Sequence, residues 1–326
     1  MKIIGIGNAL LDVLFRMEND NTLNVLGLQK GAMDIIDEAK MVEIQNLEKM
    51  LTSSMAPGGS VCNTMRSMAR LGAKAGYIGK VGIDKSGDIY NEEITRAGVT
   101  PFLVKKSGMS GCSTVLISPD GERTMATYLG LAATLSKDEI SDDVLKQYDC
   151  VYMEGYLISN DRLFLPMLQR AKELGLKIAL DLSNFNIVNG FKDLLKSVIP
   201  SYVDILFSNE SEAEAYTGLS ADKAIVELLK EVEIATVTIG KRGALAGNKE
   251  IIVHEPALNA SVIDTTGAGD NFAAGFLYGF SNGASIAQSA QIGALLAGNV
   301  IEAMGAQIEN ERWEDINLKV CEILRK

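Results

Sequence analysis

Short runs of apolar and β-branched residues alternate with amphipathic segments over most of this chain. The apolar runs predict strands at 2–7, 74–79, 150–153, 177–181, 204–207 and 235–240. The amphipathic segments predict helices at 37–51, 60–71, 85–97, 161–174, 187–199, 221–230, 270–280 and 285–301. This alternation favours an α/β fold with a mostly parallel sheet that is flanked by helices on both faces. A closed barrel is the alternative, but the predicted strands are irregularly spaced.

One region departs from this alternation and predicts a second, smaller sheet. Three extended runs follow one another at 100–106, 112–118 and 123–128, and Asp120-Gly121 is a hairpin signal between the last two. Residues from about 10 to 33 also read as extended and loop-like. We predict that 10–33 and 98–128 form a small β-sheet outside the main one. The alternative is an antiparallel edge added to the main sheet.

Composition limits the classes of function. A chain of 326 residues, 47% of them hydrophobic, can bury a large core, and we expect a single domain over 1–326. The formal net charge is −11 with no basic run, which disfavours nucleic acid and anionic membranes as partners. The N-terminus lacks the features of a signal peptide, and no apolar run has the length of a membrane span. We therefore expect a cytoplasmic monomer or homodimer that binds a small molecule.

Cysteine and histidine usage narrows the chemistry further. Cys62, Cys112, Cys150 and Cys321 are far apart, so neither a zinc cluster nor a disulfide framework is indicated. The single histidine, His254, follows a strand-like run and is expected on an edge strand or at the surface. Catalytic triads and metal sites that need histidine are thus disfavoured, and carboxylates are the candidates for acid–base chemistry.

The most informative stretch is Asp-Thr-Thr-Gly-Ala-Gly-Asp at 264–270, between the strand-like run 261–263 and an apolar predicted helix. Gly267 and Gly269 lack a Cβ, so their N–H groups can face a ligand where the helix begins. Free N–H groups and the helix dipole make such a turn a seat for phosphate oxygens. Asp270 would hold a carboxylate beside that seat, able to take a proton from a hydroxyl that attacks a phosphoryl group. A glycine turn with an ordinary helix-starting Asp is the alternative, and the whole motif in this context favours the functional interpretation.

A second glycine pair lies at the start of the helix predicted from residue 60. Gly58 and Gly59 let the backbone approach a ligand, Ser60 is a good N-cap, and Asn63 lies one turn later on the same face. Asn63 could exchange hydrogen bonds with sugar hydroxyls. A glycine turn that only caps the helix is the alternative.

Polar residues also follow three predicted strands. Asn8 and Asp12 follow the first strand, at the usual ligand-binding end of a parallel sheet, where Asp12 could bind a diol or cap a turn. Asn209 and Glu212 are three residues apart, which suits hydrated Mg²⁺ with nucleotide phosphates, or equally a capping box. The loop from Thr238 through Gly240 could follow a nucleotide or simply form a turn.

Two rival nucleotide motifs are incomplete. Gly5 and Gly7 form a GxG after a strand, but Leu10 replaces the third glycine of a dinucleotide fingerprint. Gly79-Lys80 is followed by Val81 rather than Ser or Thr, so there is no P-loop.

Taken together, these motifs resemble the PfkB/ribokinase family of carbohydrate and nucleoside kinases over essentially the whole chain. The stretch 264–270 matches the family's C-terminal signature, and Gly58, Gly59 and Asn63 match its N-terminal one. Within the family the chain is most similar to the adenosine kinase branch, through GNALLDVL, GGSVCN, DLSNF, YVDILFSNESEA and DTTGAGDNFAAGFLYG.

The resemblance implies a role for each candidate residue. Asp270 would be the general base, and the amides of Gly267, Ala268 and Gly269 would stabilise the transferred phosphoryl group. The substrate would be bound by Asn8, Asp12, Gly58, Gly59, Ser60 and Asn63. Leu10, Met33 and Tyr156 are candidates for contact with the purine ring of a nucleoside. Arg123 would approach the phosphates from the small sheet. ATP would be bound near Thr238 and Gly240, Mg²⁺ near Asn209 and Glu212, and a monovalent cation such as K⁺ near Asp264, Thr266 and Gly305.

The sequence thus predicts an ATP- and Mg²⁺-dependent kinase that phosphorylates a primary hydroxyl, the 5′-hydroxyl of adenosine first among the candidates. Phosphoryl transfer needs a cover that keeps water from acting as acceptor, so the small sheet is interpreted as a lid. A kinase for ribose, fructose or a related sugar is the first alternative. A binding protein without turnover is the second, although the candidate catalytic residues are all present.

Overall fold

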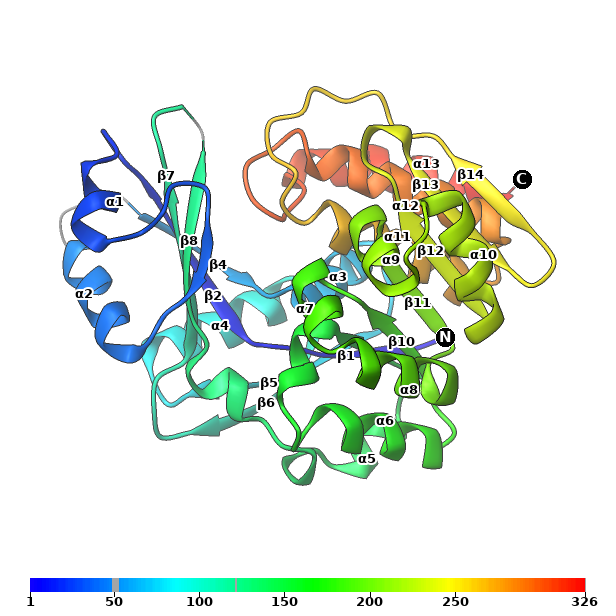
Figure 1. The fold of residues 1–326 in the computed structure, drawn as a ribbon, viewed down its shortest axis with the longest axis horizontal. Coiled ribbons are helices and arrows are strands. Elements are labelled where there is room, and N and C mark those ends of the chain that lie inside the picture. Colours follow the sequence, from blue (N-terminus) through cyan, green and yellow to red (C-terminus); the bar gives the residue numbers. More distant parts are fainter. Residues whose placement is uncertain (49–52, 121, 326) are drawn as a thin grey trace.

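The computed structural model describes residues 1–48, 53–120 and 122–325, and a nine-stranded sheet runs through its centre (Figure 1). In spatial order its strands are β14 (Ile252–Glu255), β13 (Ala244–Asn248), β12 (Ile234–Thr238), β11 (Ile205–Asn209), β10 (Lys177–Asp181), β9 (Cys150–Glu154), β1 (Ile3–Ile6), β5 (Ala75–Gly82) and β6 (Thr100–Lys106). All neighbours from β12 to β6 are parallel, whereas β13 and β14 add an antiparallel edge. The predicted fold class is confirmed.

The strands are apolar throughout because each contributes to two cores. Ile4 and Ile6 of β1 pack into one core and Ile3 into the other, as side chains that alternate across a strand must. One face is covered by α5 (Asp142–Leu145), α6 (Phe164–Glu173), α7 (Phe185–Gly190), α8 (Lys192–Tyr202), α9 (Glu210–Thr217) and α10 (Ala221–Glu231). The other is covered by α3 (Ser60–Arg70), α4 (Lys85–Arg96), α11 (Ala268–Ser281), α12 (Ile286–Val300) and α13 (Trp313–Arg325).

A five-stranded sheet stands beside this body, on the left in Figure 1. Its order is β3 (Met33–Ile35), β8 (Arg123–Tyr128), β7 (Gly111–Ile117), β2 (Leu10–Arg16) and β4 (Ser53–Gly58). One face packs against α1 (Asn21–Leu26) and α2 (Glu38–Glu48) through side chains that include Val13 and Phe15. Because side chains alternate along a strand, Leu10 and Asp12 lie on the opposite face, which lines a pocket described below.

The small sheet differs from the predicted one in its membership. Residues 100–106 form β6 at the edge of the large sheet, parallel to β5, and not a strand of the small sheet. Their apolar side chains explain this, because Phe102 and Val104 pack toward one core and Leu103 toward the other. Strand β4 and helix α1 were not predicted. Gly121 of the predicted hairpin turn and the end of the helix predicted over 37–51 lie outside the described residues.

One predicted helix and one predicted strand end differ in the structure. The helix predicted over 187–199 is divided into α7 and α8 at Phe191. Residues 261–263 are not a strand. Within the described chain their one backbone partner is the carbonyl of Ile301, and Val262 and Ile263 are exposed. His254 is exposed on edge strand β14, as predicted. All four cysteines lie in the described part of the chain, and none of them is in a disulfide.

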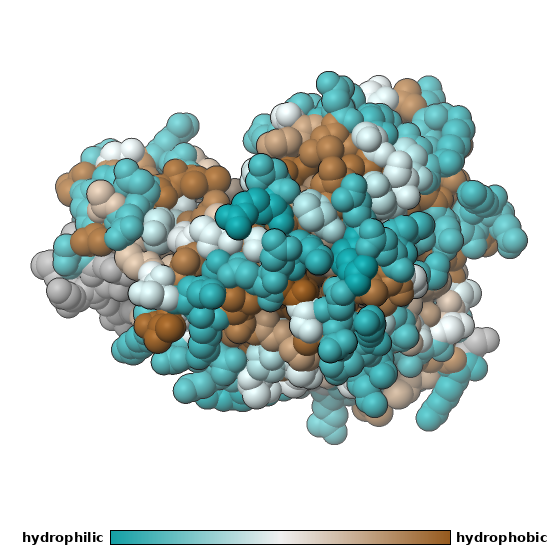
Figure 2. Space-filling model, turned by 90° about the horizontal axis from the view of Figure 1, so that it is seen from below, coloured by the Kyte–Doolittle hydropathy of each residue, from teal (hydrophilic) through white to brown (hydrophobic). Residues whose placement is uncertain are grey.

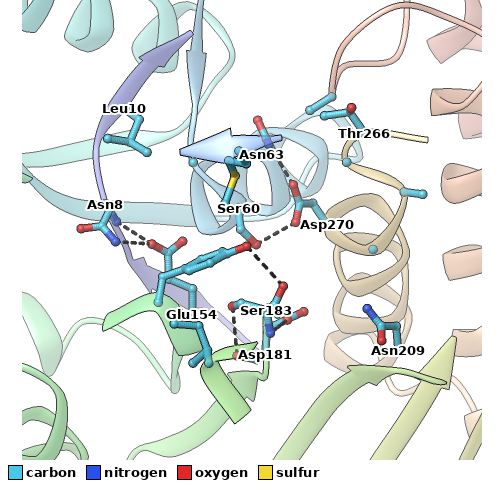
Figure 3. Close-up of a pocket in the computed structure, with 18 of the residues that line it drawn as sticks. Asn8, Leu10, Ser60, Asn63, Glu154, Asp181, Ser183, Asn209, Thr266 and Asp270 are labelled. Carbon is cyan, nitrogen blue, oxygen red and sulfur yellow. Dashed lines mark hydrogen bonds between the residues drawn. The ribbon is translucent and has the colours of Figure 1, made fainter. Parts of the chain in front are cut away.

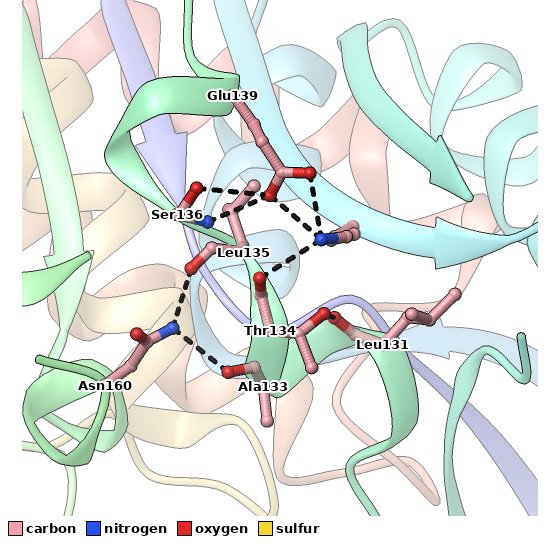
Figure 4. Close-up of polar contacts among 8 residues, drawn as sticks. Leu131, Ala133, Thr134, Leu135, Ser136, Glu139 and Asn160 are labelled. Atoms are coloured by element: carbon pink, nitrogen blue, oxygen red, sulfur yellow. Dashed lines mark hydrogen bonds and ion pairs between the residues drawn. The ribbon is translucent and has the colours of Figure 1, made fainter. Parts of the chain in front are cut away.

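The chain returns from the small sheet to the large one through a segment that a buried lysine holds in place. Lys80, on β5, donates to both carboxylate oxygens of Glu139 at 2.9 Å and to the carbonyl of Thr134 at 3.1 Å. Asn160 donates to the carbonyls of Ala133 and Leu135 from the other side (Figure 4). The link between the sheets is therefore anchored to the body by side chains.

The surface agrees with the acidic composition. On the face seen in Figure 2, hydrophilic side chains predominate and apolar ones form small groups. Within the described part of the chain, no helix combines the length and apolar character that crossing a bilayer requires.

Candidate active site

A pocket of about 430 Å³ lies where the parallel strands end at their carboxyl termini. Asn8 follows β1, and Glu154, Asp181, Asn209 and Thr238 are the last residues of β9, β10, β11 and β12. Ligands of open α/β sheets bind at this edge. The small sheet closes the opposite side with Leu10, Asp12, Met33, Ile35, Ser113, Met125 and Thr127.

Asp270 lies in the first turn of α11, and two side chains of α3 hold its carboxylate (Figure 3). The hydroxyl of Ser60 donates to Oδ1 at 2.7 Å, and the amide of Asn63 donates to Oδ2 at 2.8 Å. Burial raises the pKa of Asp270 above its usual value, although these two hydrogen bonds oppose the shift. The site therefore holds this carboxylate in a fixed orientation and makes it more basic than an exposed aspartate.

The glycine loop before α11 presents free backbone donors. Gly267 is the N-cap with φ of +75°, and a Cβ there would meet Ala306 at 2.6 Å, whereas Gly269 faces open space. Among the described residues, the N–H groups of Gly267, Gly269 and Asp270 have no hydrogen-bond partner. The N–H of Ala268 instead donates to the carbonyl of Thr265 at 3.2 Å. Three N–H groups of the loop thus point to no acceptor in the described chain, and Asp270 takes the place of Ala268 among the expected donors.

The second glycine pair allows two segments to meet. The carboxylate of Asp12 lies over Gly58, where a Cβ would overlap it. Gly59 has φ of +90°, and a Cβ there would overlap the carbonyl of Asn8. Burial and the negative charge of Asp270 raise the pKa of Asp12 to about 7. If larger residues replaced Gly58 and Gly59, the two segments could not approach each other in this way.

Asn63 has one polar atom left for a ligand. Its Nδ2 is bound to Asp270, while its Oδ1 is buried and has no partner. A buried acceptor of this kind is unfavourable unless something donates to it, and a sugar hydroxyl is a suitable donor.

Two acidic residues that the sequence analysis did not single out also belong to the pocket. Glu154 accepts from both nitrogens of Asn8 at 2.9 Å and from the N–H of Val61 at 3.2 Å, and burial raises its pKa to about 7. Burial, together with the nearby Glu212 carboxylate, raises the pKa of Asp181. Each is an acid at the carboxyl end of a predicted strand, a signal that could have identified both.

The candidate Mg²⁺ residues form a capping box at the start of α9. The Nδ2 and the N–H of Asn209 donate to Glu212, and the N–H of Glu212 donates back to Asn209 Oδ1. Burial raises the pKa of Glu212 to about 7, and burial together with the negative charge of Glu212 raises the pKa of Asp181. No group of three His, Cys, Asp or Glu side chains in the described chain could hold a metal alone. The pair fits Mg²⁺ that arrives with nucleotide phosphates, a common mode for this ion.

Arg123, which the resemblance expects near the phosphates, lies against the loop that precedes α11. It extends from β8 to an ion pair with Asp264 at 2.6 Å and a hydrogen bond to Thr266 Oγ1 at 3.1 Å. Asp264 also accepts from the N–H groups of Thr266 and Gly305. The three candidate residues for a monovalent cation are therefore together, but the cation on Asp264 is the guanidinium of Arg123. This arrangement does not fit K⁺ at the carboxylate.

A second cavity, of about 560 Å³, adjoins the first. Thr238 and Gly240 line it together with Lys241, and Leu258, Val262, Ala297 and Ile301 give it an apolar wall. The two cavities share Thr238, Thr265, Ala268, Gly269 and Phe272. Their common boundary is therefore the start of α11, where Asp270 and the free N–H groups lie.

Comparison with known proteins agrees with this geometry. The model of the pfkB family carbohydrate kinases matches residues 31–313. An uncharacterized sugar kinase of Archaeoglobus fulgidus is 31% identical over 74% of this chain and 96% of its own length. An adenosine kinase of Saccharomyces cerevisiae is 28% identical over 95% of this chain and 97% of its own. The crystal structure of adenosine kinase from Sinorhizobium meliloti superposes with a TM-score of 0.85, at 31% identity, over 98% of this chain and 99% of that one.

Proposed function

Since the chain belongs to the pfkB family of carbohydrate kinases, we propose that it transfers a phosphoryl group from ATP to a nucleoside, at the 5′-hydroxyl of adenosine. The family and the kinase reaction are the premise, and the nucleoside acceptor is the proposal. Proteins named adenosine kinase among the relatives and solved structures support the choice of acceptor.

Two adjoining cavities support transfer between two bound molecules. The cavity with the apolar wall suits the nucleotide, and the pocket with Asp12, Asn63 and Asp270 suits the acceptor. The shared boundary holds free N–H groups, and such groups at a helix start bind phosphate oxygens. The reacting atoms would meet there.

The character of the acceptor pocket is the observation that carries the nucleoside proposal. None of the described residues that line it is lysine or arginine, and five are carboxylic acids: Asp12, Glu154, Asp181, Glu212 and Asp270. A phosphorylated sugar would find no basic side chain to pair with among these residues, which favours a neutral acceptor. The pocket also has an apolar wall, made by Leu10, Met33, Ile35, Met125, Leu129 and Ile187. Such a wall suits the flat ring of a nucleobase, whereas a free sugar has no comparable apolar surface.

Each residue of the site has a defined role in the proposed phosphoryl transfer. The acceptor hydroxyl oxygen attacks the γ-phosphorus as Asp270 takes its proton, and the bond from that phosphorus to the β–γ bridging oxygen breaks to release ADP. The N–H groups of Gly267, Gly269 and Asp270 donate to the phosphoryl oxygens, whose negative charge they stabilise. Mg²⁺, near Asn209 and Glu212, supplies charge neutralisation at the phosphates when bound. The small sheet acts as the lid that excludes water.

A screen for ADP release tests this function. The purified protein is incubated with MgATP and, in turn, with adenosine, inosine, guanosine, ribose, fructose or fructose 1-phosphate. We expect ADP release with adenosine and little with either free sugars or the sugar phosphate. Turnover with free sugars alone would mean that the acceptor is a sugar and not a nucleoside. No turnover with any acceptor would favour a binding protein.

A further inference from the structure

A third cavity, of about 280 Å³, lies behind the acceptor pocket and shares only Asn63 and Ala306 with it. Helix α3 contributes Arg66, Ser67 and Arg70 to its wall, and α4 contributes Glu93, Arg96 and Ala97. Ala306, Gln307, Ile308, Asn310 and Trp313 close the other side. Nothing in the proposed phosphoryl transfer uses this cavity.

Three arginines converge here in a chain whose net charge is −11. Arg66 and Arg70 are one helical turn apart, and like charges at that spacing destabilise a helix. Within the described chain neither arginine forms an ion pair, whereas Arg96 pairs with Glu93 on its own helix. Glu93, which is paired with Arg96, also acts on Arg66, but within the described chain no acid is in ion-pair contact with Arg66 or Arg70.

The arginines also have donors to spare. Arg66 donates from Nη1 to the carbonyl of Pro57 at 3.0 Å, but its Nε is buried without a partner. Burial lowers the pKa of Arg66, as expected for a guanidinium whose charge is poorly solvated. Arg70 lies over the ring of Trp313, with 5.7 Å from its central carbon to the ring centroid, and donates to Asn310. An anion in the cavity would place negative charge beside the guanidinium groups and offset their mutual repulsion.

We propose that this cavity binds a phosphate group, either inorganic phosphate or the phosphate of a small metabolite. Guanidinium groups present several N–H donors in a planar fork that matches phosphate oxygens. The surrounding amides of Gln307 and Asn310 and the hydroxyl of Ser67 are neutral, and Glu93 is already paired. The site is distinct from the acceptor pocket, which has no arginine or lysine among its described lining residues. It does not depend on which acceptor the enzyme uses.

Trp313 gives a local measurement of binding, because it is the only tryptophan in the chain and lines the cavity. Inorganic phosphate is titrated into the full-length protein at constant ionic strength while tryptophan emission is recorded. We expect a saturable change that potassium chloride does not reproduce. Arg66→Gln should weaken the apparent affinity at least tenfold, whereas Arg16→Gln, at an exposed site on β2, should leave it unchanged.

Two further variants keep the result interpretable. Gly269→Ala places a methyl group in the glycine loop and should leave the tryptophan response intact, because that loop is a separate phosphate seat. Arg70→Gln, measured by calorimetry since it changes the surroundings of Trp313, should also weaken binding. The proposal is overturned if phosphate gives no response, if both arginine variants bind it normally, or if Gly269→Ala abolishes the response. If ribose 5-phosphate competes with inorganic phosphate, the site accepts the phosphate of a metabolite. If it does not compete, the site is selective for inorganic phosphate.

Discussion

Asn63 donates a 2.8 Å hydrogen bond to Oδ2 of Asp270, a residue 207 positions later in the chain. This bond and the one from Ser60 to Oδ1 join the first turn of α3 to the first turn of α11. Asn63 also has a buried oxygen without a partner among the described residues. The residue that is proposed to bind the acceptor therefore also orients the proposed base.

The first prediction concerns Asp270 as the base. Asp270→Asn keeps the size and much of the hydrogen bonding of the side chain, but the amide cannot take the proton from the hydroxyl of the acceptor. We expect kcat to fall by about 10²–10⁴-fold, the usual contribution of general base catalysis, with acceptor affinity nearly unchanged. Steady-state kinetics and calorimetry with adenosine measure the two effects. Turnover like that of the wild type would contradict the assignment.

The second prediction concerns the pH dependence of the rate. Burial raises the pKa of Asp270, so its carboxylate is protonated at a higher pH than an exposed aspartate and then cannot act as base. The rate should therefore fall with decreasing pH at a higher pH than an exposed aspartate would give. A profile of kcat/KM over the stable pH range measures this. A fall confined to the usual aspartate range would exclude a base with a raised pKa.

The third prediction concerns stability and Glu154. Its pKa is raised from 4.5 to about 7, so the folded protein binds a proton that the unfolded chain releases in this range. The contribution of Glu154 to the free energy of unfolding is therefore lost as pH rises from about 4.5 to 7, by about 3 kcal/mol at most at 1.4 kcal/mol per pKa unit.

Glu154→Gln removes this titration, so wild type should lose stability relative to the variant over that range. Urea denaturation of both proteins between pH 5 and 8 measures the difference. Glu92→Gln, an exposed and otherwise similar change, should show a difference that does not vary with pH. A constant difference for Glu154→Gln as well would show that its proton is not coupled to folding.

The fourth prediction separates backbone conformation from close approach. Gly59 and Gly72 both have φ of +90°, but a Cβ would overlap the carbonyl of Asn8 at Gly59 and meets nothing within 4 Å at Gly72. Gly72→Ala should destabilise the protein by about 1 kcal/mol through its backbone conformation alone. Gly59→Ala should destabilise it more and should also raise the KM for the acceptor. Equal effects of the two changes on both quantities would mean that the approach of Asn8 is unimportant.

The fifth prediction concerns Arg123 and Asp264, which are 14% and 9% exposed and connect the small sheet to the loop before α11. Arg123→Gln and Asp264→Asn should each be destabilising, because each leaves a poorly solvated charge without its partner. Their effects should not add, and a double-mutant cycle in urea should give a coupling of about 1–3 kcal/mol. Additive effects would show that the ion pair contributes nothing to the position of the loop.

The parts of the fold that could be predicted were those with a strong local pattern. The apolar strands at 150–153 and 177–181 and the helix from residue 60 lie where the sequence placed them, because burial on one or both faces leaves a clear periodicity. Strand β4 could not be predicted in this way. Its sequence Ser-Ser-Met-Ala-Pro-Gly has little strand character, and its pairing with β2 determines its conformation.

The candidate site shows the same division. Local motifs indicated Asp270, Asn63 and the glycine loops, since helix starts and turns have recognisable residues. The partner of Arg123 depends on how the small sheet packs against the loop at 264–266, a contact between segments about 140 residues apart. The identity of the third free donor also required coordinates, because only the turn geometry shows that the N–H of Ala268 is already bonded.

The separate walls of the two main cavities allow one side of this enzyme to diverge while the other stays constant. Met33 and Ile35, on the short edge strand β3, line the acceptor side and are exposed, and neither touches the nucleotide side. Exchanges at these two positions can therefore alter the preferred acceptor without disturbing the donor. A scaffold divided in this way would let acceptor preference change through the side chains of one short edge strand.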